Sequence, residues 1–117
     1  MPHCVIECPE NISDLINLDS LVKEVHDATE DSGLFSVGDV KSRIVLSKNY
    51  LVGGKKDYYV HIVTHILSGR TQTQRKNLSD RIALRLCELL PTVEMLSVEV
   101  REIDKEIYSN RKSVEKI

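Results

Sequence analysis

The pattern that most restricts how this chain can fold is a strand–helix–strand order that occurs twice along the sequence. Residues 2–8 and 41–46 are expected to be strands on either side of one helix, while strands at 58–67 and within 93–103 flank a second helix. Each connecting segment is long enough for a right-handed crossover between parallel strands. The order predicts an α+β fold, in which both helices cover the same face of one four-stranded mixed sheet.

Capping residues and apolar residues at helical spacing define the two helices. Asn11 or Ser13 is expected to cap the first helix. Its apolar stripe consists of Leu15, Leu18, Leu21, Val22 and Val25. Thr71 or Thr73 is expected to cap the second helix, and Pro91 to end it. The stripe of this second helix consists of Leu78, Ile82, Leu86, Leu89 and Leu90.

With 117 residues and a mass of 13.3 kDa, the chain is expected to form a single domain, residues 1–117. Its two strand–helix–strand halves are about 2–47 and 58–103. The segment 48–57 contains a Gly-Gly pair followed by two lysines, which is typical of an exposed loop or hairpin tip. The polar residues 104–117 are expected to form a C-terminal tail, either as a terminal turn of helix or as an arm.

The charge balance argues against nucleic acid as a partner. The 16 basic and 18 acidic residues give a formal charge of -2, whereas a nucleic-acid module normally has a basic excess. No apolar run approaches the roughly 18 residues that span a bilayer, so no membrane association is expected. The first residues lack the features of a signal peptide. Three cysteines without such a signal indicate reduced thiols and a cytoplasmic location.

The strands carry apolar residues toward both faces of the predicted sheet. Two helices cover only one of these faces, and an apolar face left in water costs about 25 cal/mol per Å². The pairs that point to opposite faces are Val5 and Ile6, Ile62 and Val63, and Met95 and Val98. Because another copy of the chain could cover the open face, we expect a closed homo-oligomer.

Pro2 is the sharpest candidate for chemistry. It follows the initiator methionine, so removal of Met1 would leave a secondary amine at the chain start. An ordinary α-amine titrates near about 7.7–8.0, and cationic neighbours or an apolar pocket lower its pKa. Such an amine could transfer protons near neutral pH. The alternative is that Met-Pro is an ordinary chain start without a chemical role.

Three basic residues are candidates for binding an anion. Lys41 and Arg43 are two residues apart in one predicted strand, so their side chains point to the same face. Arg70 lies at the turn between the third strand and the second helix, where free helix N–H groups favour anions. Arginine binds carboxylates through paired hydrogen bonds. The alternative for each residue is a solvated surface charge.

Two histidines form a weaker candidate site. His61 and His65 are four residues apart on one face of the third strand, as a metal-binding pair could be. No clear third ligand accompanies them, so we expect a strand surface or a subunit interface and no metal. His3 could line a site near Pro2, although its side chain leaves the strand on the opposite face. Glu7 could orient a substrate or form an ion pair, and we expect the ion pair.

The segments MPHCVIEC, KSRIVL and HIVTHILSGRT resemble the 5-carboxymethyl-2-hydroxymuconate isomerases of the tautomerase superfamily. The resemblance extends from Met1 to about Ile103. It implies a tautomerase-like β-α-β-β-α-β subunit and a homotrimer whose sheets face a central core. It also implies that Pro2, freed of Met1, moves a proton between positions of an anionic dienol acid without any cofactor, as a step of aromatic catabolism.

The resemblance further implies that cationic side chains at positions 41 and 70 bind the substrate carboxylates and carbonyl. Position 41 is arginine in the relatives and lysine here, which keeps the charge but loses the bidentate fork. Arg43 could take over part of that role. Two alternatives stay open: a tautomerase for a different keto or dienol acid, and a non-catalytic oligomeric module that binds a small acid or a protein.

Overall fold

The computed structural model describes all 117 residues and contains one four-stranded sheet. Its strands are β1 (His3–Pro9), β2 (Lys41–Ser47), β3 (Tyr59–Leu67) and β4 (Met95–Ile103). They lie side by side in the order β2-β1-β3-β4. β1 is parallel to β2 and β3 is parallel to β4, whereas the central pair β1 and β3 is antiparallel. The predicted mixed sheet is thereby confirmed.

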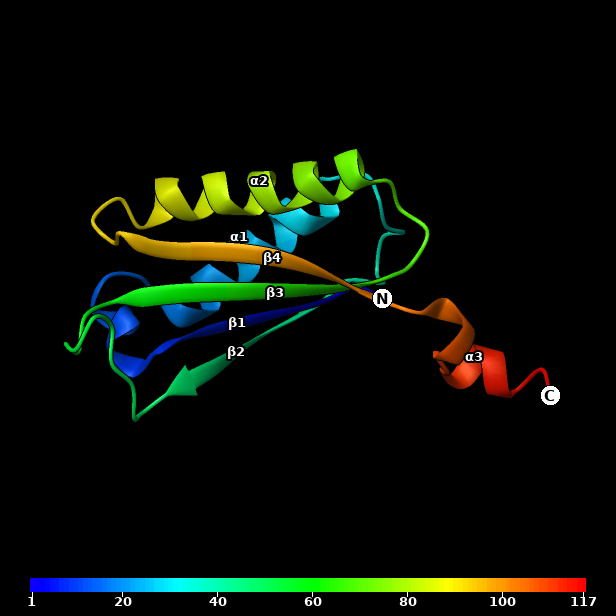
Figure 1. Cartoon of the computed structure of the whole chain (residues 1–117), viewed down its shortest axis with the longest axis horizontal. Coiled ribbons are helices and arrows are strands. Elements are labelled where there is room, and N and C mark those ends of the chain that lie inside the picture. The colour runs from blue at the N-terminus through cyan, green and yellow to red at the C-terminus, as the bar shows by residue number, and fades with distance from the viewer.

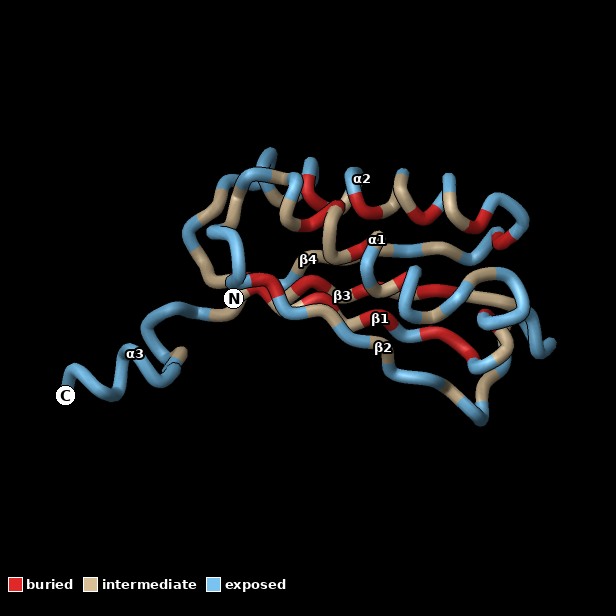
Figure 2. The backbone as a smooth tube through the Cα atoms, turned by 180° about the vertical axis from the view of Figure 1, so that it is seen from behind, coloured by how far each residue is buried: buried red, intermediate tan, exposed pale blue.

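Helices α1 (Leu18–Glu30) and α2 (Gln72–Leu89) pack together on one face of this sheet (Figure 1). The buried residues gather between the helices and the strands (Figure 2). Their largest members are Ile6, Ile12, Leu21, Ile62, Ile66, Leu78, Ile82, Leu86 and Leu90. Burial of these side chains is the main favourable contribution to folding. No helix combines the length and the apolar character that a membrane span requires.

Helix α1 begins later than the sequence predicts. Its cap is Asn17, whose side chain accepts a hydrogen bond from the backbone N–H of Ser20 at 3.1 Å. The earlier candidates lie in a 3-10 turn at Glu10–Asp14 and have other partners. Ser13 Oγ donates to the carbonyl of Glu10, and Asn11 Nδ2 donates to the hydroxyl of Tyr50. The predictions of Asn11 or Ser13 as the cap are therefore wrong.

Helix α2 begins where one of the two predictions placed it. Thr71 Oγ1 accepts from the backbone N–H of Gln74 at 3.1 Å, and the Gln74 side chain accepts from the backbone N–H of Thr71 at 2.9 Å. This reciprocal pair is a capping box, which satisfies two N–H groups that a helix start leaves free. Thr71 is thus the cap, and Thr73 lies inside the helix.

The Gly-rich segment between the two halves forms a small hairpin, as expected. Gly53 and Gly54 have positive φ angles of 56° and 82°, a conformation that suits glycine. Val52 and Lys55 pair across this two-residue turn. The segment 104–117 leaves the end of β4 as an exposed tail with a short helix, α3 (Arg111–Val114), and extends away from the sheet (Figures 1 and 2).

The open face of the sheet is more polar than the sequence argument expects. Val5 and Val63 are paired on this face, and Met95 lies on it with 55% of its surface exposed. Most of their neighbours are charged or polar: His3, Glu7, Lys41, Arg43, Tyr59, His61, His65, Ser97, Glu99 and Arg101. The open face is therefore a mixed surface with isolated apolar side chains.

Candidate active site

Pro2 lies buried at the start of β1, beside the first residue of β2. Its carbonyl oxygen accepts a hydrogen bond from the backbone N–H of Lys41 at 3.1 Å. Burial, and then the neighbouring Lys41 ammonium, lower the pKa of the Met1 amino group. The chain start thus lies in surroundings that disfavour a positive charge on an amine.

The register of the two parallel strands places both strand cations near this chain start. Lys41 pairs with His3 and Arg43 pairs with Val5, so the two side chains share a face, as predicted, and this face is the open one. Lys41 Nζ donates to the carbonyl of Asp39 at 2.6 Å. Neither Lys41 nor Arg43 forms an ion pair, so no carboxylate of the chain neutralises these two charges.

Arg43 has a side-chain partner on β1. Its Nη1 donates to His3 Nδ1 at 3.0 Å, which requires an unprotonated Nδ1 because a guanidinium has no acceptor. Burial, and then the charges of Arg43 and Lys41, lower the pKa of His3. The imidazole therefore lies in surroundings that favour its neutral form, which can accept this bond. His3 shares a face with both cations, so it lines the candidate site.

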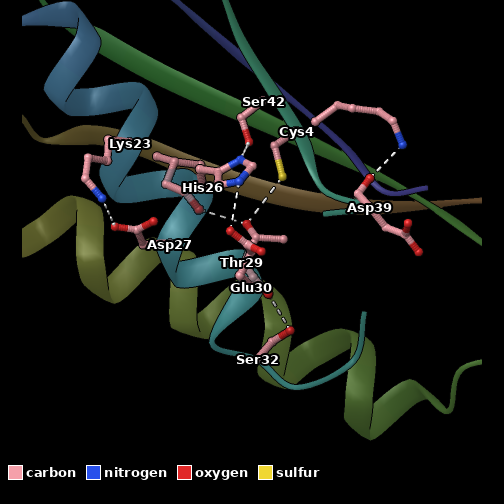
Figure 3. Close-up of polar contacts among 11 residues, drawn as sticks. Cys4, Lys23, His26, Asp27, Thr29, Glu30, Ser32, Asp39 and Ser42 are labelled. Carbon is pink, nitrogen blue, oxygen red and sulfur yellow. Dashed lines mark hydrogen bonds and ion pairs between the residues drawn. The ribbon is translucent and has the colours of Figure 1, made fainter. Parts of the chain in front are cut away.

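The same stretch of β2 is fixed from beneath by helix α1. Ser42, between the two cations, points to the helix face, where its hydroxyl lies 2.8 Å from His26 Nδ1 (Figure 3). His26 Nε2 also lies 2.9 Å from Glu30. On the neighbouring strand, Cys4 Sγ lies 3.3 Å from the hydroxyl of Thr29. These contacts tie α1 to both strands under the site, so the backbone that carries the cations is anchored.

Arg70 lies at the same end of the sheet, because β3 runs antiparallel to β1 and ends where β1 begins. Its guanidinium donates to the carbonyl of Leu34 and stacks 5.3 Å from the ring centroid of Phe35. Its Nε is buried without a hydrogen-bond partner, and Arg70 forms no ion pair. The loop after α1 holds Arg70, and no hydrogen bond joins it to Pro2, Lys41 or Arg43.

The histidine pair of β3 has partners of its own. His61 Nδ1 lies 2.6 Å from Ser97 Oγ, and its Nε2 lies 2.8 Å from Glu99. Arg101 also donates to Glu99, at 2.6 Å. His65 shares the face as predicted, and no cluster of three or more His, Cys, Asp or Glu side chains is placed to hold a metal. Glu7 accepts from the hydroxyl of Tyr59 at 2.9 Å and forms no ion pair, so that prediction is wrong.

Two cavities lie away from these residues and have no counterpart in the sequence analysis. One, of about 690 Å³, lies between α1 and α2, and half of its ten lining residues are acidic. The other, of about 520 Å³, lies at the opposite end of the sheet from Pro2. Apolar and aromatic residues from the hairpin and two strands line it: Tyr50, Leu51, Val52, Tyr59 and Met95. Tyr59 follows the hairpin closely in the sequence, whereas Met95 lies much later in the chain, on β4. No local motif therefore indicates this cavity.

Comparison with known proteins gives related sequences and structures. A model of the family described as 5-carboxymethyl-2-hydroxymuconate isomerase matches residues 2–116. A 5-carboxymethyl-2-hydroxymuconate Delta-isomerase of Escherichia coli is 27% identical over 84 residues, which cover 70% of this chain and 67% of that relative. The crystal structure of a 5-carboxymethyl-2-hydroxymuconate isomerase from Deinococcus radiodurans R1 has a TM-score of 0.82 and 21% identity, covering 94% of this chain and 88% of that chain. A fused 4-OT, described as a symmetric trimer, has a TM-score of 0.77 and 15% identity, covering 93% and 91%.

Proposed function

The chain belongs to the 5-carboxymethyl-2-hydroxymuconate isomerase family of the tautomerase superfamily, and we propose that it moves a proton within an anionic dienol acid such as 5-carboxymethyl-2-hydroxymuconate. The observation that carries this proposal is a pair of cations beside the chain start. Lys41 and Arg43 both lie on β2, beside the beginning of β1, and have no carboxylate partner within the chain. Such a surface attracts a substrate with several carboxylates.

In the proposed reaction, Pro2 acts as a free amine after Met1 has been removed. The amine takes the proton of the 2-hydroxyl group, the double bonds shift, and the protonated amine returns a proton to the distal carbon. The reaction moves one proton and shifts the double bonds with no net oxidation or reduction, so the proposed step uses no redox cofactor. Lys41, Arg43 and Arg70 are the proposed groups that bind the carboxylates and stabilise negative charge on the oxygens.

The environment of the chain start favours the neutral form of an amine. Burial and Lys41 already lower the pKa of the Met1 amino group, which lies next to the position that a free Pro2 amine would occupy. An amine must be unprotonated to accept a proton, and a pKa near the working pH gives the best general base. One set of cations would therefore both bind the substrate and keep the base neutral.

We also propose that the protein is a cytoplasmic homotrimer whose sheets face a common centre. A fused 4-OT that shares this fold is described as a symmetric trimer. The open face carries Val5, Val63 and Met95, which a second copy would shield from water. All three cysteines are free, in keeping with a reducing compartment. Light scattering on the purified protein would give the mass of the assembly.

The test of the proposed function is ultraviolet-monitored ketonisation of 5-carboxymethyl-2-hydroxymuconate by protein whose measured mass shows that Met1 is absent. Catalysed conversion that Pro2→Ala slows severely would support the mechanism. Conversion only of other dienol or keto acids would favour a different substrate, which the lysine at position 41 makes a specific alternative. Retention of Met1, with no turnover of any such acid, would favour a non-catalytic binding module.

A further inference from the structure

The contact between Arg43 and His3 joins a proposed substrate-binding cation to the residue that follows the proposed base. Arg43 Nη1 donates to His3 Nδ1 at 3.0 Å, across the parallel strands β1 and β2. Arg43 forms no other side-chain hydrogen bond within the chain, and no carboxylate of the chain accepts from its guanidinium. His3 is half-buried on the open face and outside the hydrophobic core.

We propose that His3 is a positioning residue that holds the Arg43 guanidinium in place on the open face for a substrate carboxylate. This inference rests on the proposed function, because it concerns the same anionic substrate. The bond reaches from β2 to the first residue of β1, so it holds the guanidinium at the end of the sheet where Pro2 lies. An unanchored arginine on an open sheet face would sample many rotamers in water.

The groups around His3 favour the neutral imidazole that this role requires. Lys41 and Arg43 face it from β2, His65 faces it from β3, and the chain-terminal amine precedes it on β1. The nearby carboxylate of Asp39 acts on the terminal amine. Burial and these positive charges lower the pKa of His3, so its Nδ1 stays free to accept from Arg43.

The anchored guanidinium has one consequence for the reaction. It presents its remaining N–H groups in a fixed direction for a substrate carboxylate, which lowers the entropic cost of binding. Loss of the anchor should therefore raise KM and change kcat little. A purely structural role for His3 would not separate KM from kcat in this way.

The kinetic test compares His3→Ala with His3→Asn, since the Asn Oδ1 can accept a hydrogen bond near the position of Nδ1. In His3→Ala, we expect kcat/KM to fall about tenfold at neutral pH, mainly through KM. His3→Asn should restore most of this loss. The matched control is His65→Ala, which removes the imidazole paired with His3 across β1 and β3 and leaves the contact with Arg43. An unchanged KM in His3→Ala, or equal losses in the Ala and Asn variants, would overturn the proposal.

A second readout does not depend on turnover. In protein labelled with ¹⁵N-histidine, the nuclear magnetic resonance spectrum should show His3 with the proton on Nε2 and an unprotonated Nδ1. Replacement Arg43→Met should raise the pKa of His3, because a positive neighbour is removed. A proton on Nδ1 at neutral pH would overturn the inference even in an active enzyme. An inactive wild-type protein with the expected spectrum would instead count against the proposed function.

Discussion

The backbone N–H of Lys41 donates to the carbonyl oxygen of Pro2 at 3.1 Å, so the first residue of β2 is bonded to the residue proposed to carry the catalytic amine. This bond uses the Pro2 carbonyl and leaves its nitrogen free for chemistry once Met1 is removed. It also fixes the strand register that sets Lys41 beside His3 and Arg43 beside Val5. The cations and the amine are therefore positioned by main-chain pairing.

The first prediction concerns Pro2 itself. Pro2→Ala keeps the carbonyl that bonds to Lys41, but it replaces a rigid secondary amine with a primary one. We expect kcat to fall by about 10²–10⁴-fold, the usual contribution of general acid–base catalysis. The measurement is steady-state kinetics on the substrate named above, and circular dichroism and the assembly mass should stay unchanged. Full activity in this variant would remove Pro2 from the mechanism.

The second prediction concerns the lysine at position 41. Lys41→Ala should raise KM about tenfold or more, because one charged hydrogen bond to a carboxylate is lost. Lys41→Arg should lower KM below that of Lys41→Ala, since the guanidinium restores the charge and adds a bidentate fork. The control is Lys48→Ala, which removes a lysine from the loop after β2, near Pro9 and Tyr50. A KM that is the same in all three variants would show that Lys41 does not bind substrate.

Most of the fold could be predicted from the alternation of residues along the strands, because a period of two decides which residues share a face. It placed Lys41 and Arg43 together, and it separated Val5 from Ile6 across the sheet. The bond between Arg43 and His3 could not be predicted this way, because it depends on how β1 and β2 align. Nothing in the sequence specifies that register before the strands pair.

The sequence also could not show which of several similar capping residues begins a helix. Asn11, Ser13 and Asn17 are all good helix caps, and the structure selects Asn17 because the preceding residues form a 3-10 turn. Arg70 illustrates a different limit. Its partners, Leu34 and Phe35, come from a loop more than thirty residues earlier, so its orientation depends on tertiary packing.

The third prediction uses the cap of α2. Thr71→Ala should lower the free energy of unfolding by about 1 kcal/mol, because it removes the acceptor for the Gln74 N–H. Thr73→Ala is the matched control: it changes the same residue type two positions later, inside the helix, and should have a much smaller effect. Urea unfolding at one fixed protein concentration measures both. Equal destabilisation by the two substitutions would contradict the role of Thr71 as the cap.

The fourth prediction concerns thiol reactivity. Burial, and then the charge of Glu7, raise the pKa of Cys8 to about 11, so it stays a protonated thiol at pH 8. Cys4 is also fully buried, whereas Cys87 is exposed on α2. Brief alkylation of native protein at pH 8 should therefore add one label, at Cys87, and alkylation after denaturation should add three. Mass spectrometry of the intact chain and its peptides reads the result. Rapid labelling of Cys8 in native protein would contradict this packing.

The last prediction links pH to stability through the open face. A hydrogen bond from Arg101, and then one from His61, lower the pKa of Glu99. The folded state thus favours the ionised carboxylate. This stabilisation is fully present at a pH above the ordinary pKa of a Glu side chain, and it is lost as the pH falls through the lowered pKa of Glu99 in the folded state. Glu99→Gln should make the free energy of unfolding less dependent on pH between about 5 and 3, in urea titrations at a fixed protein concentration. Glu94→Gln, at an exposed carboxylate without an ion pair, should leave the wild-type pH dependence in place. If Glu99→Gln also kept the wild-type pH dependence, the contacts of Glu99 with Arg101 and His61 would not contribute to stability at acidic pH.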